Sequence, residues 1–124
     1  MKIATILIQN GVRLLGLILI ILGILFWSGH AFNLVSLHMR LGETLCGLLI
    51  LLAIVGIVAR LNLVLTAIAI VWAFVVVIFG MRMGQLVPGP AHELIRVLHF
   101  LFGLVAIALS ESLAARISKR STRK

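Results

Sequence analysis

Four long apolar runs occupy most of this chain and constrain its fold more than any other feature. They extend over residues 6–27, 37–59, 61–80 and 91–115. A helix needs roughly 20 mainly apolar residues to cross a bilayer, and each run has that length. Hydrophobic residues form 63% of the 124 residues and charged residues only 11%, a balance that excludes a soluble domain. The sequence therefore predicts an integral membrane protein with four spanning helices.

The lengths of the runs and of the connectors between them predict the architecture. We expect one all-α domain over residues 1–124, an up-down-up-down four-helix bundle. A membrane β-barrel is excluded, because no run alternates between apolar and polar residues with period two. The connector around Arg60 is so short that the second and third helices must be antiparallel neighbours. Asn33 is expected to cap the second helix and Pro90 to lie in the first turn of the fourth.

The basic residues predict the orientation of the bundle. Three of them, Arg40, Arg82 and Arg96, belong to the side away from the termini, whereas the other eight belong to the side of the termini, where residues 116–124 form a basic tail. The positive-inside rule then places both termini in the cytoplasm, and we expect the chain in the inner (cytoplasmic) membrane of the cell. No aromatic residues interleave with the charges of the tail, so its expected contact is anionic lipid rather than nucleic acid.

The first run has a second interpretation. Lys2 and Arg13 precede the apolar residues 14–27 in the manner of a signal peptide. We favour an uncleaved helix, because the apolar residues already begin at Ile3 and continue for longer than a typical signal sequence.

Small and polar residues recur on one face of each run, which predicts the faces that point inward. In lipid such residues gather where helices meet, because close approach and hydrogen bonds drive helix association. On this basis we expect Gly42 and Gly103 to be tight packing positions and Cys46 to be a buried apolar residue. The predicted inward face of the first run is Gln9, Gly16, Gly23, Trp27 and His30, and that of the second is His38, Gly42, Leu49, Ala53 and Gly56. The predicted face of the third run is Asn62, Thr66, Ala69, Ala73 and Gly80, and that of the fourth is His92, Arg96, His99, Gly103, Ala106, Ser110 and Ala114.

All four histidines fall in the half of the bundle away from the termini, together with two arginines and two glutamates. Ionisable groups inside spans are costly and mark a functional site by default. Ion pairs at i,i+3 spacing, Arg40 with Glu43 and Glu93 with Arg96, account for part of this layer. They do not account for His99, which lies about two turns deeper than His92.

One pattern occurs twice and suggests a cofactor. His38 precedes Gly42, and His99 precedes Gly103, by one helical turn each. The second and fourth helices run parallel in such a bundle, so the two imidazoles would face each other across its axis. Imidazole is a normal axial ligand of haem iron, which predicts a b-type haem between His38 and His99. The glycines would make room for the macrocycle, and Arg40 or Arg96 would pair with its propionates.

Several alternatives remain open at this stage. His92 is an alternative partner in the histidine pair, and a zinc or copper ion held by His30, His38 and His92 is another possibility. Two functions without a bound cofactor are also open. The bundle could be a non-catalytic accessory or self-associating protein, or a small proton-coupled transporter that uses Glu43 or Glu93. Glu111 is expected to balance Arg116. Neither a phosphate loop nor a nucleophilic triad is present, so an enzymatic role is not favoured.

The first two-thirds of the chain resembles a known family. Arg13-Leu14-Leu15-Gly16 followed by Gly23, and Glu43 four residues before Gly47, are similar to the first two helices of DoxX-like proteins, small four-helix bacterial membrane proteins. The glycine-rich, aspartate-containing ending common in that family is missing. The resemblance implies an association with quinone or with a respiratory complex.

Overall fold

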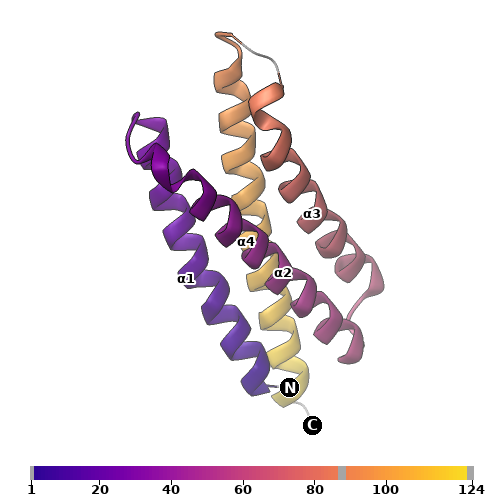
Figure 1. Cartoon of the computed structure of the whole chain (residues 1–124). Helices are drawn as coiled ribbons and strands as arrows, with labels where there is room; N and C mark the ends of the chain where they lie inside the picture. Colours follow the sequence, from indigo (N-terminus) through magenta and orange to yellow (C-terminus); the bar gives the residue numbers. More distant parts are fainter. Residues whose placement is uncertain (1, 87–88, 123–124) are drawn as a thin grey trace.

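A computed structural model describes residues 2–86 and 89–122 and shows an all-α bundle of long helices (Figure 1). Within the described residues there are four of these, each long and apolar enough to cross a membrane. They are α1 (Lys2–Trp27), α2 (Val35–Val58), α3 (Leu63–Arg82) and α4 (His92–Thr122), with short 3-10 turns at Phe32–Leu34 and Met83–Gln85. The predicted fold class is therefore confirmed.

The order of the helices in space follows the predicted up-down-up-down path. Both termini and the α2–α3 connector lie at one end of the bundle, here called the terminal end (Figure 1). The α1–α2 and α3–α4 connectors lie at the opposite end, here called the far end. The parallel helices α2 and α4 contact each other directly, and α1 and α3 each pack against both of them. The pair α2–α4 thus forms the centre of the bundle.

The α2–α3 connector is a tight turn built on a residue in a left-handed conformation. Arg60 has a φ of 60°. Its amide donates to the carbonyl oxygen of Ile57 at 3.0 Å, and the Leu61 amide donates to that of Gly56 at 2.9 Å. These two bonds form a Schellman motif, which satisfies the last carbonyl groups of α2. The side chain of Asn62 then accepts a hydrogen bond from the Val64 amide and caps α3, so Asn62 is a cap rather than part of an inward face.

Two expected helix starts are wrong by one or two residues. Ala31 adopts a left-handed conformation, with a φ of 61°, and opens a 3-10 turn that includes Asn33. The cap position of α2 therefore falls on Leu34, which makes no side-chain bond there. Pro90 lies in a turn two residues before α4, whose first residue, His92, donates its amide to the Gly89 carbonyl.

Helix α4 continues beyond the predicted end of the fourth span. It extends through Thr122, so the described part of the basic tail is helical. Ile117 within this extension is completely buried in the core. The basic side chains of this segment are thus held on a helix that packs against the bundle.

The buried side chains confirm most of the predicted inward faces of α2 and α3 and the second half of that of α4. Leu49, Ala53, Ala69, Ala106 and Ala114 are all fully buried. The predicted face of α1 is confirmed at Gly16, which is buried, and at Gln9, which bonds to α4, but it is wrong at Trp27 and His30, which are exposed. The other buried positions of α1 are Thr5, Val12 and Leu22. Lipid solvates apolar side chains as well as a protein core does, so sequence contrast alone does not fix which face of a helix packs.

Candidate functional site

The two histidines of the repeated pattern face each other near the far end of the central helix pair. His38 lies close to the start of α2 and His99 two turns into α4. Because α2 and α4 run parallel from the far end, both side chains reach a similar depth. Their ring centroids are 6.3 Å apart, and the ring planes are inclined by 56°. The fold therefore brings these two residues of the predicted site together.

Aromatic side chains and a glycine hold the two rings in place. Phe26 of α1 contacts the ring of His38 edge-on, with the centroids 5.3 Å apart. Phe79 of α3 stacks on His99 with the centroids 6.2 Å apart and the planes only 11° from parallel. A Cβ atom at Gly80 would lie 3.0 Å from Cε1 of His99, so the absence of a side chain there lets the ring lie against α3. Each imidazole is therefore positioned by a neighbouring helix as well as by its own.

The Nδ1 atoms of both rings are buried without a partner. Neither His38 Nδ1 nor His99 Nδ1 forms a hydrogen bond with any described residue. Buried polar atoms in proteins are nearly always paired, and an exception is explained by strain, a functional role, or a missing water or ion. Two such atoms on facing imidazoles make this pair the most unusual polar feature of the bundle.

The glycines of the two patterns are not tight packing positions. No side chain or distant backbone atom lies within 4 Å of a Cβ built at Gly42 or at Gly103. The expectation that they mediate close helix contact is therefore wrong. Close contact occurs instead at Gly16, where a Cβ would be 2.9 Å from Ile107 Cδ1, and at Gly56, where it would be 3.1 Å from Thr66 Cγ2. One turn beyond each histidine the helix surface is open.

The remaining histidines are bound to the far-end connectors. His92 donates from Nδ1 to the carbonyl oxygen of Leu86 at 3.1 Å. His30 is exposed, and its Nδ1 lies 3.3 Å from the hydroxyl oxygen of Ser28. Among the described residues no group of three or more metal-ligating side chains comes together. The three-histidine zinc or copper site is therefore not formed, because His30 and His92 are held by the loops next to them.

The charged residues of the histidine layer lie at the surface of the bundle. Arg96 donates to Glu93 at 3.0 Å in the expected i,i+3 ion pair, and both side chains are exposed. The expected pair of Arg40 with Glu43 is not formed within the described residues, and both of these side chains are exposed too. Neither glutamate faces the interior, as a carboxylate in a transport path would.

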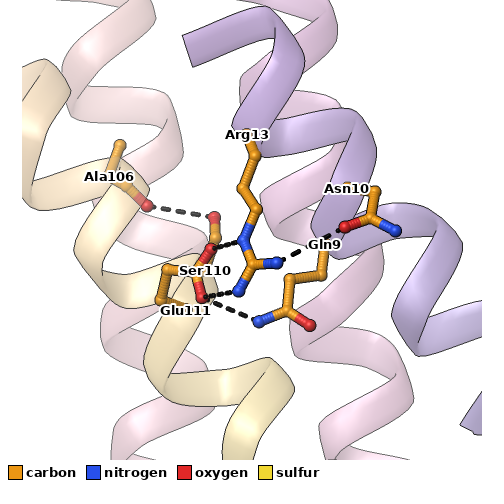
Figure 2. Close-up of polar contacts among 6 residues, drawn as sticks. All are labelled: Gln9, Asn10, Arg13, Ala106, Ser110 and Glu111. Carbon is orange, nitrogen blue, oxygen red and sulfur yellow. Dashed lines mark hydrogen bonds and ion pairs between the residues drawn. The ribbon is translucent and has the colours of Figure 1, made fainter. Parts of the chain in front are cut away.

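A second polar cluster joins α1 to α4 (Figure 2). The bounds of these helices place its ion pair in the half of the bundle nearer the termini. Arg13 binds Glu111 through two parallel bonds, Nε to Oε1 at 2.6 Å and Nη2 to Oε2 at 2.9 Å. Gln9 donates to the same carboxylate at 2.7 Å, and Arg13 Nη1 donates to Asn10 at 3.4 Å. Such a bidentate pair is the strongest geometry for arginine and carboxylate.

The expected partner of Glu111 is therefore wrong. Arg116 donates to the Ser112 hydroxyl at 3.4 Å, and Glu111 turns to the neighbouring helix instead. The sequence contains a signal for this cluster, because Gln9, Asn10 and Arg13 interrupt an otherwise apolar run within about one turn. Arg13 lies about 16 Å along α1 from Lys2, so the ion pair falls inside the apolar span rather than at its end.

Comparison with known proteins adds no relative to this description. No family model matches the chain, and no match is found among characterised proteins or solved structures. The identification of a function therefore rests on the side chains described above.

Proposed function

We propose that the bundle binds one b-type haem between His38 and His99 and carries electrons within the membrane. The observation that supports this proposal most directly is the pair of facing imidazoles, each with a buried nitrogen that has no partner. Imidazole pairs of this kind are normal axial ligands of haem iron.

The separation of the rings agrees with the space that one metal ion needs. Two metal–nitrogen bonds of about 2.0 Å and the two ring radii together give a centroid separation of roughly 6 Å. The rings of His38 and His99 are 6.3 Å apart. A direct hydrogen bond between the rings would bring them closer, so the spacing favours an atom between them.

The surroundings of the pair fit a flat apolar cofactor. Gly42 and Gly103 leave open space one turn beyond each ligand, on the side away from the far end. Phe26 and Phe79 lie against the imidazoles and give them apolar neighbours. Arg96, on the far-end side of His99, would pair with the propionates, and Arg40 would do so from α2. When bound, the haem supplies one-electron oxidation and reduction, which no side chain of this chain performs at moderate potential.

We also propose an orientation and a class of redox partner. The excess of basic residues at the terminal end places that end in the cytoplasm, so that the haem lies in the outer half of the bilayer. A haem in that half suits quinone or a respiratory complex as the electron partner, which is also what the resemblance of the first two helices to DoxX-like proteins implies. A C-terminal reporter that is active only in the cytoplasm tests the orientation.

The visible absorption spectrum of the protein purified with ample haem supply tests the proposal. We expect a low-spin spectrum whose bands sharpen on reduction, typical of two imidazole ligands. His38→Ala and His99→Ala should each abolish it.

His30→Ala and His92→Ala are the matched controls, because these residues also lie at the far end but are bound to the connectors. They should leave the spectrum intact. A colourless wild-type protein would rule out the haem and leave a non-catalytic accessory bundle as the better account. A spectrum that disappears in His92→Ala but persists in His99→Ala would identify His92, and not His99, as the second ligand.

A further inference from the structure

We propose that the terminal end of the bundle contains a specific binding site for one anionic phospholipid, formed between the end of α4 and the start of α3. The site is independent of the haem, since it lies at the other end of the molecule. Its residues are Arg116, Lys119 and Arg120 from α4, and Leu61, Asn62 and Leu65 from the connector and α3, which together line a cavity of about 230 Å³.

No carboxylate side chain in the described part of the chain compensates the charge of this cavity. Of the three acidic residues in the chain, Glu111 is bound by Arg13 and Glu93 by Arg96. Glu43 lies about 22 Å along α2 from its terminal end. Three basic side chains therefore surround the cavity without a carboxylate among the lining residues.

Within the described residues, the hydrogen bonds of these side chains leave most of their N–H donors without a partner. Arg116 has one bond of 3.4 Å to a serine hydroxyl, and Arg120 has one of 3.5 Å to the Ala59 carbonyl. The ammonium group of Lys119 has no partner among the described residues. Arginine binds phosphate oxygens through paired N–H groups, and lysine adds a point charge. Together these donors match the phosphodiester of a lipid headgroup.

The position and the walls of the cavity identify a lipid rather than a soluble anion. The cavity lies where the apolar part of α3 begins, which is the level of the headgroups for a helix that spans the bilayer. Leu61 and Leu65 form its apolar wall. Leu63 and Val64 next to it are 67% and 66% exposed, on a surface suited to acyl chains. No aromatic side chain lines the cavity, as a site for nucleic-acid bases would require.

The basic helix end is also held rigidly, as a specific site needs. Ile117, between two of the cationic residues, is completely buried in the core. The bond from Arg120 to Ala59 connects α4 to the end of α2. The cations are therefore fixed relative to α3 and are not a freely moving tail.

Lipid binding to the delipidated full-length protein in uncharged detergent tests this inference. Native mass spectrometry with phosphatidylglycerol and with phosphatidylcholine compares an anionic with a zwitterionic headgroup that share the phosphodiester. We expect at least about tenfold tighter binding of phosphatidylglycerol, given roughly fivefold per basic residue near the headgroup. The triple variant Arg116→Gln/Lys119→Gln/Arg120→Gln should lose this preference.

Single variants keep the test valid if the triple variant does not fold. Lys119→Gln should weaken phosphatidylglycerol binding about fivefold, and Lys119→Arg should restore it. Lys2→Gln is the matched control, since it removes one lysine from the same end of the bundle outside the cavity, and it should have no effect. Equal binding of the two lipids, equal effects of Lys2→Gln and Lys119→Gln, or complete displacement of the lipid by excess inorganic phosphate would each overturn the inference.

Discussion

Replacing Gly16 with leucine adds a branched side chain where α1 already touches its neighbours. A Cβ at this position would be 2.9 Å from Ile107 Cδ1 and 3.9 Å from Leu45 Cδ1. Overpacking of a filled core typically costs about 1–3 kcal/mol. The change from glycine to leucine in a helix stabilises the folded state by somewhat less than 1 kcal/mol, because glycine loses more backbone entropy on folding. Gly16→Leu should therefore lower the free energy of unfolding by up to about 2 kcal/mol.

Gly103→Leu is the matched variant on α4, with the opposite expected result. No atom outside the local helix backbone lies within 4 Å of its Cβ position, so only the gain in helix propensity remains. The free energy of unfolding should stay constant or rise by up to about 0.8 kcal/mol. The two variants should thus differ by roughly 2 kcal/mol.

Reversible unfolding in mixed micelles, followed by far-UV circular dichroism as the denaturing detergent is increased, measures this difference. The cofactor-free protein must be used, because a ligand adds its own stabilisation. If Gly103→Leu destabilises the bundle as much as Gly16→Leu, the space beside Gly103 is not open and the packing argument is wrong. In the haem-loaded protein Gly103→Leu should reduce haem content without loss of fold, because the leucine fills the space proposed for the macrocycle.

Two further predictions concern the terminal half. Glu111→Gln should destabilise the bundle in a bilayer, because it leaves the Arg13 charge without its partner inside the span. Adding Arg13→Gln should recover much of the lost stability. If the double variant is no more stable than the single one in the same unfolding assay, the unpaired charge is not the cause of the loss. Arg60→Gly should raise the free energy of unfolding by about 1 kcal/mol, because the residue has a φ of 60°; an unchanged or lower stability would contradict the assigned turn geometry.

The sequence by itself determined the number of spans, their order and their approximate limits. These properties depend on the local cost of placing backbone and charged groups in lipid, which is a function of composition within one run. The pairing of His38 with His99 also followed from the order of the spans. The second and fourth helices run parallel, so equivalent early positions in them lie at equal depth. The end of α4 was misjudged, since residues 116–122 look like a polar tail until Ile117 is seen to pack into the core.

Only the tertiary structure decided which faces of the helices pack and which polar groups pair. The predicted face of α1 was wrong at Trp27 and His30, and Glu111 binds Arg13 from another helix rather than Arg116 from its own. Gly42 and Gly103 resemble packing glycines in sequence as closely as Gly16 does, yet only Gly16 has a neighbour in contact. In lipid an apolar face gains little by being buried, so helix rotation is set by close contacts and a few interhelical hydrogen bonds. Those depend on the relative positions of residues far apart in the chain, which local sequence does not encode.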